Sequence, residues 1–346
     1  MFRRAKFKIA IGFNIVNRAW GGGNQFVKSL KEYLENKGHL VVHDLKSNDI
    51  DIILIIDPRS RISNISFSTG SILRYLLFKN NKAIIVHRIN ECDERKNTKT
   101  MNFKLRMANF CSDQTIVVSD WLKKLNLFDE KNKENILTIR NGSNASIFNS
   151  IGHKKWSKTN KLKFVTHHWS GNWMKGFDIY KKFDLMLEKK NWNEKFEFTY
   201  IGNIPKNFSF KHTKHIEPLY EKDLANELRK HHGYLSASQN EPGGNHQNEG
   251  ALCGLPLLYR NSGCLPEYCD GYGIKFNKSN FEKKLIEFFQ NYSFFYDRIK
   301  LYPYTDKITC KAYLNLFSNL LSNRSEIIKK RKILSSPFKF LINHFI

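Results

Sequence analysis

Short apolar runs alternate with helical stretches along the first 126 residues, and this alternation constrains the fold more than any other feature. The first apolar run, Lys6 to Phe13, predicts a strand, and a glycine-rich turn leads from it into a helix that ends near Lys37. Further strands are predicted at residues 40–42, 50–56, 83–86 and 115–118, with helical stretches near 70–79, 98–110 and 119–126. Strands that alternate with helices in this way form a parallel sheet.

A second alternation begins after residue 161 and predicts a second domain of the same kind. Strands are expected at residues 162–166 and 196–201, and helices at 177–188 and 221–230. The stretch 280–323 is also expected to be helical, and its apolar stripe is more typical of a core than of a site. This stripe consists of Tyr313, Leu316, Phe317, Leu320 and Leu321. With 346 residues, 41% of them hydrophobic, the chain is long enough for two cores.

The expected fold class is therefore α/β, with two similar domains. We place the first domain at residues 1–150, a polar linker at 151–161 and the second domain at 162–304. Residues 305–346 are expected to form terminal helices.

Residues 234–273 concentrate glycines, carboxylates and a helix start, and they predict a ligand site. A buried strand is expected to end near Leu235, after which Pro242, Gly243 and Gly244 turn the backbone sharply. Asn245 is then placed to cap a helix that runs to about residue 254. The unpaired amides and positive dipole of a helix start attract anions, most often phosphate.

Two glutamates of this block, Glu241 and Glu249, are separated by seven residues, so they cannot bind one atom. They could grip two ends of an extended ligand, with sugar hydroxyls on one carboxylate, ribose hydroxyls on the other and phosphates between. A nucleotide sugar has this shape. The alternative is that the two glutamates occupy a solvated surface by chance.

The whole block, with ALCGLPLLY and SGCLPEYC after the second glutamate, resembles the donor-site signature of retaining glycosyltransferases of family 4. This resemblance implies the glycosyltransferase-B fold, two Rossmann-like domains that face each other across a cleft. It also implies that the terminal helices of residues 305–346 cross back to the first domain. It implies that Glu241 contacts the transferred sugar and that Glu249 holds the ribose. Glu267 matches a later acidic position of the motif. The implied donor-binding residues of the block are Gly243, Gly244, Asn245 and Glu249.

The resemblance extends to Lys175 and Gly176, which match a Lys-Gly pair whose lysine neutralises the donor diphosphate. A solvated lysine before a helix is the alternative. Backbone groups at Gly202 and near Leu219 are expected to contact the base. The sequence departs from the family at residues 167–170, HHWS, where an arginine is usual, and at 245–248, which are polar instead of apolar.

In the first domain, the glycine turn that includes Gly22 and Gly23 resembles the family's amino-terminal loop, which meets the donor phosphates or the acceptor. His87 follows the apolar run AIIV, and the resemblance implies that it touches the donor sugar, with Arg88 and Asp93 as neighbours. A histidine in this position is otherwise a hydrogen-bonded structural residue. Residues 141–148 resemble a turn that closes the first domain, which we interpret as structural.

The expected activity is transfer of a sugar from a nucleotide diphosphate sugar to a hydroxyl of a glycan, glycolipid or similar acceptor, with retention of configuration. The predicted catalytic residues are His87, Glu241 and Lys175, and no metal or other cofactor is expected. Two alternatives stay open: a phosphorylase or epimerase on the same fold, and a basic, surface-associated binding protein without catalysis.

The net charge of +25 admits three explanations: an A/T-rich genome, nucleic acid, or an anionic membrane surface. No nucleic-acid-binding motif is present, so we expect no nucleic-acid partner. Six cysteines without paired spacing favour the cytoplasm, and no apolar run is long enough to span a membrane. The basic, aromatic stretch 326–346 is either a peripheral hook for anionic lipid or a terminal helix docked on the first domain.

Overall fold

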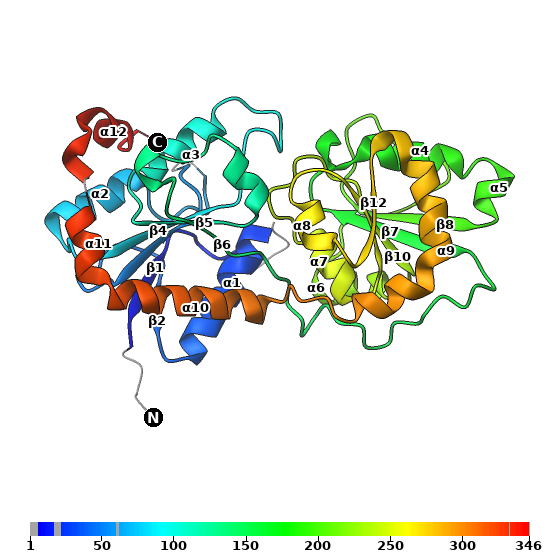
Figure 1. Ribbon diagram of the computed structural model, residues 1–346, viewed down its shortest axis with the longest axis horizontal. Helices are drawn as coiled ribbons and strands as arrows, with labels where there is room; N and C mark the ends of the chain where they lie inside the picture. Colours follow the sequence, from blue (N-terminus) through cyan, green and yellow to red (C-terminus); the bar gives the residue numbers. More distant parts are fainter. Residues whose placement is uncertain (1–5, 17–21, 60–61, 332, 346) are drawn as a thin grey trace. The chain divides into compact units, whose positions relative to one another are not determined.

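The computed structural model describes residues 6–16, 22–59, 62–331 and 333–345. The chain divides into two compact units (Figure 1): unit 1 comprises Met1–Arg140 and Asp306–Ile346, and unit 2 comprises Asn141–Thr305. Each unit contains one parallel sheet of six strands, with helices against it. The predicted α/β class with two similar domains is confirmed.

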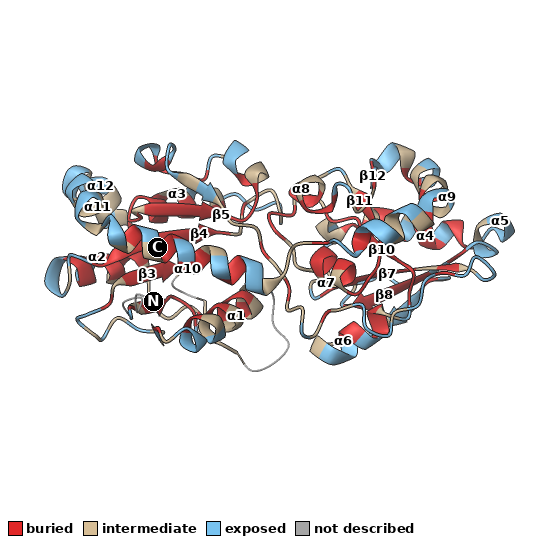
Figure 2. Cartoon of the chain, turned by 60° about the horizontal axis from the view of Figure 1, so that its bottom comes forward, coloured by how far each residue is buried: buried red, intermediate tan, exposed pale blue. Residues whose placement is uncertain are grey.

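The sheet of unit 1 has the strand order β2-β1-β3-β4-β5-β6. Its strands are β1 (Lys8–Ile11), β2 (Leu40–Val42), β3 (Ile52–Ile55), β4 (Ile84–Ile89), β5 (Gln114–Val117) and β6 (Ile136–Thr138). Every residue of β3 and β4 is buried, as expected for inner parallel strands that are covered on both faces (Figure 2).

The longer helices of unit 1 are α1 (Gly22–Asn36), α2 (Thr69–Phe78), α3 (Met101–Asn109), α10 (Asp306–Ser322), α11 (Arg324–Lys330) and α12 (Pro337–Ile342). Short 3-10 turns lie at Asp120–Lys124, Glu130–Asn132 and Ile333–Ser335. Helix α10 packs against α1, and both contribute to one core through Leu30 and Phe317. The apolar stripe predicted at residues 313–321 lies in this core.

The sheet of unit 2 has the order β12-β11-β10-β7-β8-β9. Its strands are β7 (Leu162–His168), β8 (Phe196–Gly202), β9 (Lys214–Ile216), β10 (Gly233–Ser236), β11 (Leu257–Arg260) and β12 (Gly273–Phe276). Its helices are α4 (Phe177–Met186), α5 (Lys190–Asn193), α6 (Glu221–Leu228), α7 (His246–Leu252), α8 (Leu265–Cys269) and α9 (Phe281–Ile299), with 3-10 turns at Trp173–Lys175 and Lys278–Asn280.

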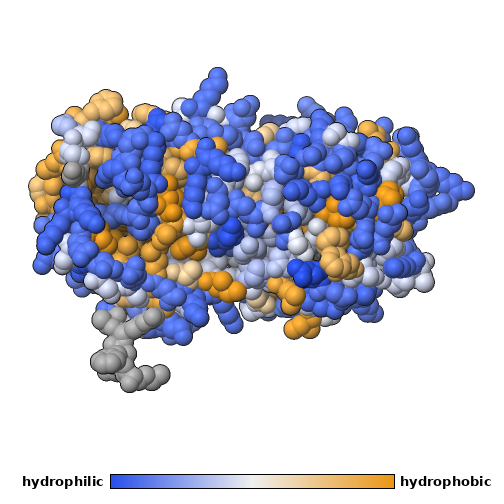
Figure 3. Space-filling model, in the orientation of Figure 1, coloured by the Kyte–Doolittle hydropathy of each residue, from blue (hydrophilic) through white to orange (hydrophobic). Residues whose placement is uncertain are grey.

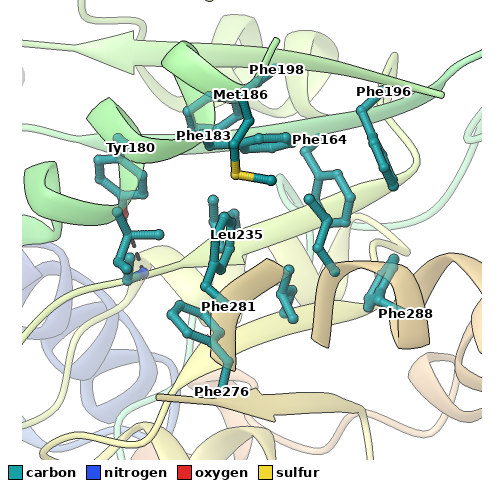
Figure 4. Close-up of a cluster of buried hydrophobic side chains, with 14 of the residues drawn as sticks. Phe164, Tyr180, Phe183, Met186, Phe196, Phe198, Leu235, Phe276, Phe281 and Phe288 are labelled. Atoms are coloured by element: carbon teal, nitrogen blue, oxygen red, sulfur yellow. Dashed lines mark hydrogen bonds between the residues drawn. The ribbon is translucent and has the colours of Figure 1, made fainter. Parts of the chain in front are cut away.

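Aromatic side chains fill much of the core of unit 2 (Figure 4). Phe183 on α4 stacks on Phe198 of β8 with ring centroids 5.0 Å apart. On the sheet's neighbouring strand, Phe164 contacts Phe288 of α9 at the same separation of 5.0 Å. This packing fixes α4 and α9 against the sheet. Because α4 is fixed, the loop between β7 and α4 is held in place as well.

The strand order places a topological switch point beside β7. The chain moves from β7 to β8 on one side, and later returns to add β10 on the other side. In parallel α/β sheets, ligands bind beyond the carboxyl ends of the strands at such a point. The loops after β7 and β10 are therefore the expected site of unit 2. The corresponding point of unit 1 lies between β1 and β3.

Three local predictions differ from the structure. The strand predicted at 83–86 continues to Ile89, so His87 and Arg88 lie within β4 and not after it. The helical stretch 280–323 is two helices, because Pro303 lies in the break at 300–305 and cannot continue a helix. Within the predicted helix 119–126, Asp120–Lys124 form a 3-10 turn instead of an α-helix. None of the helices in the described part of the chain is long and apolar enough to cross a membrane.

Candidate active site

Lys175 and Glu241 meet at the switch point of unit 2. Lys175 ends the 3-10 turn after β7, where the Asn172 side chain accepts a hydrogen bond from the backbone N–H of Met174 at 2.8 Å. Glu241 lies in the loop after β10. The two side chains form an ion pair, with Lys175 Nζ 2.5 Å from Glu241 Oε2. The backbone N–H of Gln239 donates to the carbonyl of Met174 at 2.8 Å and joins the two loops directly.

The close approach of these loops requires glycine at position 176. Gly176 has a φ of +103°, and a Cβ added there would lie 2.5 Å from the Cβ of Ala237. The Lys-Gly pair noted in the sequence therefore has a steric basis. The glycine lets the loop after β7 reach the loop after β10, and the lysine before it points to Glu241.

The backbone of Glu241 is held by the segment between β11 and α8. Cys264 donates its backbone N–H to the carbonyl of Glu241 at 2.8 Å. Gly263 has a φ of +57°, and a Cβ there would come within 2.5 Å of the Glu241 backbone. Because Glu241 is 2% exposed, its carboxylate is nearly shielded from water. The SGC triplet at 262–264 thus positions the first glutamate of the motif.

Glu249 lies on α7 and is bonded to His167 at the end of β7, with Glu249 Oε2 2.6 Å from His167 Nε2. The other ring nitrogen of His167 is 3.1 Å from the hydroxyl of Tyr234. Burial raises the pKa of Tyr234 well above its ordinary value, so this hydroxyl stays protonated. When the Tyr234 hydroxyl donates to Nδ1 of His167, the ring proton lies on Nε2. His167 then donates this proton in its hydrogen bond to Glu249. His167 therefore occupies the region where the resemblance implies an arginine, and it orients the second glutamate.

The polar residues 246–248 face inward, which explains their departure from the apolar pattern. His246 Nε2 lies 2.8 Å from the hydroxyl of Ser236, and Gln247 donates to the carbonyl of Gly244 at 2.5 Å. The Asn248 side chain accepts from the Tyr302 hydroxyl at 2.6 Å and donates to the carbonyl of Asn141 at 3.1 Å. These buried hydrogen bonds replace apolar packing beneath the 241–245 turn.

Asn245 occupies the predicted N-cap position of α7, but its side chain does not cap the helix. Its backbone has φ −92° and ψ −20°, which is helical and not the extended conformation of an N-cap that bonds to its helix. The side-chain oxygen Oδ1 is buried and has no hydrogen-bond partner among the described residues. The predicted capping interaction is wrong, although the helix begins where it was expected.

Asn141 supports the glycine turn, a role that the sequence did not indicate. Its side chain donates to the carbonyl of Gly243 at 2.6 Å, and its backbone N–H donates to the hydroxyl of Tyr268 at 2.8 Å. We had interpreted residues 141–148 only as a turn that closes the first domain. No local sequence signal indicates this contact, because Asn141 and Gly243 are 102 residues apart.

The remaining predicted residues of unit 2 are Gly202, Leu219 and Glu267. Gly202 ends β8 with a φ of +124°, and a Cβ there would lie 2.0 Å from the carbonyl oxygen of His168. The fold itself thus requires this glycine. Leu219 packs against the core near α6 and β11, and Glu267 lies in α8, where its carbonyl accepts from the Tyr304 hydroxyl at 3.2 Å.

The site residues predicted in unit 1 belong to its helix starts and its core. Gly22 and Gly23 begin α1, and a Cβ at Gly23 would meet nothing within 4 Å. The earlier part of that glycine turn, including Trp20 and Gly21, lies outside the described residues. Asp93 accepts from the backbone N–H groups of Met101 and Asn102, each at 2.9 Å, and so stabilises the start of α3.

His87 and Arg88 are buried within β4. His87 Nδ1 lies 3.4 Å from the side-chain nitrogen of Asn109, and burial lowers the pKa of His87 to about 3. The guanidinium of Arg88 lies over the ring of Phe26, 4.0 Å from its centroid. His87 is therefore neutral at physiological pH, and its ring belongs to the interior of unit 1.

An Asp-x-Asp triplet at 49–51 serves structural contacts. Asp49 pairs with Lys8 at 2.6 Å, and Asp51 pairs with Arg324 of α11 at 2.5 Å. Within the described residues, no three His, Cys, Asp or Glu side chains gather into a group that could hold a metal ion.

Comparison with known proteins places this geometry in a known fold. No protein-family model matches the chain, and no curated protein matches it in sequence. Solved structures match nearly the whole chain. A glycosyltransferase from Rickettsia africae ESF-5 has a TM-score of 0.64 and 14% identity, over 92% of this chain and 99% of that one.

Two further solved structures match equally well. Sucrose-phosphate synthase from Thermosynechococcus elongatus has a TM-score of 0.63 and 12% identity, over 92% of this chain and 100% of that one. HepE from Anabaena, solved with UDP-glucose, has a TM-score of 0.65 and 11% identity, over 90% of this chain and 100% of that one. The chain therefore has the glycosyltransferase-B fold, as the sequence resemblance implied.

Proposed function

We propose that the protein is a retaining glycosyltransferase whose unit 2 binds a nucleotide diphosphate sugar at the carboxyl ends of β7 and β10. The observation that carries this proposal is the ion pair between Lys175 and Glu241, which come from the two loops beside the switch point. The structural matches support it, since HepE was solved with UDP-glucose and starch synthase IV of Arabidopsis thaliana with ADP and acarbose.

The Lys175–Glu241 pair suits a site in which Lys175 exchanges the Glu241 carboxylate for the diphosphate of the donor. Without donor, the ammonium of Lys175 neutralises a carboxylate that is only 2% exposed. A bound diphosphate offers more negative charge to Lys175. Glu241 is then released to accept hydrogen bonds from the hydroxyls of the transferred sugar. Gly243 and Gly244 bring the backbone close to the phosphates. Asn141 donates a hydrogen bond to the carbonyl of Gly243, and Gln247 donates one to the carbonyl of Gly244.

Glu249 is assigned to the ribose hydroxyls, and His167 is assigned as its positioning residue. The short bond between them orients the carboxylate from the side of β7. Because His167 is engaged with Glu249, Lys175 carries most of the neutralisation of the diphosphate. Gly202 and Leu219 are assigned to the neighbourhood of the base. His87 is given no contact with the donor, because its imidazole is buried within β4.

In the proposed reaction, the oxygen of an acceptor hydroxyl bonds to the anomeric carbon while the bond from that carbon to the diphosphate breaks. The acceptor proton passes to the departing diphosphate oxygen, and a nucleoside diphosphate is released. Lys175 stabilises the negative charge that grows on this leaving group. Retention follows when the acceptor approaches from the face that the diphosphate leaves. The acceptor proposed is a glycan or a lipid-linked glycan, in a cytoplasmic pathway of polysaccharide synthesis.

Thermal melting in the presence of nucleotides tests this assignment. One nucleoside diphosphate and its sugars should raise the melting temperature of the wild type, because they bind only the folded state. In Glu249→Gln, the ribonucleotide should raise the melting temperature no more than its 2′,3′-dideoxy analogue, which lacks the ribose hydroxyls, raises that of the wild type. If no nucleotide in a panel of the common donors shifts the melt, the proposal fails.

Release of nucleoside diphosphate separates an enzyme from the binding-protein alternative. With the stabilising donor and a mixture of acceptor glycans, the wild type should release nucleoside diphosphate, and Glu241→Gln should release it at least about 100-fold more slowly. Donor binding without release by the wild type would favour a non-catalytic protein on this fold.

A further inference from the structure

The C-terminal segment of unit 1 is fixed to the rest of the unit by its charged and amide side chains. Arg331 forms an ion pair with Asp113 at 2.5 Å, and Lys339 of α12 forms one with Asp129 at 2.6 Å. Asn343 is buried and donates to the carbonyl of Met107 at 2.9 Å. These polar side chains point into unit 1, where most surface helices place apolar ones.

Large apolar side chains of the same segment point outward. They are Leu334, Phe338, Leu341 and Phe345, which are 67%, 70%, 60% and 84% exposed and which we name the tail face. Figure 3 shows apolar side chains gathered over the α12 end of unit 1. The segment therefore combines inward ion pairs and the partly buried Ile333 and Phe340 with an outer face of exposed apolar side chains. A cluster of exposed large apolar residues is the signature of a surface that meets an apolar partner.

The charge of the chain decides which partner fits this face. Residues 324–346 contain six Lys and Arg and one acidic residue, and the whole chain carries a net charge of +25. Lys329 and Lys330, which end α11 just before Leu334 in the sequence, are both exposed. Two copies with so much like charge repel each other, whereas a surface rich in anionic lipid attracts the lysines and also accepts the aromatic rings.

We propose that the tail face docks the protein on a bilayer that contains anionic lipid. Phe338, Leu341 and Phe345 enter the boundary between headgroups and acyl chains, and Lys329 and Lys330 lie against the headgroups. The ion pairs of Arg331 and Lys339 hold the segment on unit 1, so docking fixes unit 1 at the surface. The proposal does not depend on the donor site of unit 2.

Co-sedimentation with vesicles tests the apolar part of this contact. The full-length protein should sediment with vesicles of phosphatidylglycerol and phosphatidylcholine, and much less with phosphatidylcholine alone. Phe338→Ser together with Leu341→Ser should lower the partition coefficient on the order of tenfold or more. The control is Phe294→Ser, which removes an aromatic ring of similar exposure, 62%, from α9 in unit 2.

Charge reversal tests the electrostatic part. Lys329→Glu with Lys330→Glu should weaken sedimentation by more than about tenfold, since each basic residue at an anionic surface is worth roughly fivefold. Reversal of Lys189 and Lys190, an exposed lysine pair of unit 2, should have a clearly smaller effect.

Three outcomes would overturn the proposal. The first is a wild type that stays in solution with both vesicle types, and the second is a tail-face variant that sediments like the wild type. The third is a concentration-dependent dimer that the Phe338→Ser and Leu341→Ser variant abolishes, which would make a second copy the partner. Surface substitutions are preferable to deletion of the segment, because deletion would leave Asp113 and Asp129, each 4% exposed, without their cations.

Discussion

Nζ of Lys175 lies 2.5 Å from Oε2 of Glu241, and the two side chains are only 13% and 2% exposed. Each therefore shields the other's charge in a region that water hardly reaches. Loss of either partner would remove this counter-ion from a nearly buried charge, which costs far more than the pair itself contributes. This relationship links the stability of unit 2 to the residues that we assign to the donor.

We expect Lys175→Met to lower the free energy of unfolding of unit 2 by roughly 3 kcal/mol. Adding Glu241→Gln removes the stranded carboxylate and should recover most of this loss, while donor binding stays absent. Urea unfolding followed by tryptophan fluorescence would measure it, because four of the six tryptophans, Trp156, Trp169, Trp173 and Trp192, belong to unit 2. A double variant no more stable than Lys175→Met would contradict the pairing.

Substitution of Gly23 by alanine tests whether the glycine turn is needed for ligand binding or for packing. A methyl group at Gly23 meets nothing within 4 Å, and alanine favours a helix over glycine by about 1 kcal/mol. Gly23→Ala should thus leave unit 1 equally or more stable in thermal melts. If the turn approaches donor or acceptor closely, the variant should still lose transferase activity. Full activity would show that Gly23 is not needed for a close approach to donor or acceptor.

The matched control for that experiment is Gly202→Ala. Its Cβ would lie 2.0 Å from the carbonyl oxygen of His168, and its φ of +124° is unfavourable for alanine. This variant should lose stability and donor binding together, so its binding defect carries no information about direct contact.

The repeated strand-helix pattern predicted the α/β class because periodicity is a local property of the chain. It located all the inner strands of the unit 1 sheet and β7, β8 and β10 of the unit 2 sheet, but it did not identify β6, β9, β12 or the inner strand β11. Of these, β6 and β9 have only three residues each. The end of β4 was predicted too early because His87 and Arg88 interrupt the apolar run. Both residues are nevertheless buried in the strand.

At the candidate site, the sequence indicated Lys175, Glu241 and Glu249 through their motif, but it did not indicate their partners. His167 lies 82 residues from Glu249, and Asn141 lies 102 residues from Gly243. Pairings over such separations depend on the order of strands in the sheet, which local patterns do not encode. The polar residues 246–248 looked like a departure until their inward hydrogen bonds were visible.

Burial of His87 predicts a pH dependence of the stability of unit 1. The pKa of the imidazole is about 6.5 in an unfolded chain and about 3 in the folded protein. Below pH 6.5 the unfolded state therefore binds a proton that the folded state does not. The contribution of His87 is present in full above pH 6.5 and is lost at about 1.4 kcal/mol per pH unit as the pH falls toward 3.

Replacement of His87 by leucine removes this titration. The difference in unfolding free energy between wild type and His87→Leu should shift by about 2 kcal/mol in favour of the variant between pH 7.5 and pH 5. His212→Gln, at an exposed position of unit 2, serves as the control. An equal shift for both variants would mean that His87 is not buried in solution.

Arg331 is the strongest attachment of the C-terminal segment to unit 1. Its guanidinium contacts both carboxylate oxygens of Asp113 and also donates to the carbonyls of Asn81 at 2.7 Å and Ala83 at 2.6 Å. The side chains of the pair are 7% and 4% exposed, so Arg331→Met should destabilise the docked segment by roughly 3 kcal/mol or more. Arg331→Lys should recover little, because an ammonium cannot make this planar set of bonds. Hydrogen exchange of α11 and α12 would measure the loss, and unchanged protection in Arg331→Met would show that Lys339 and Asn343 hold the segment without it.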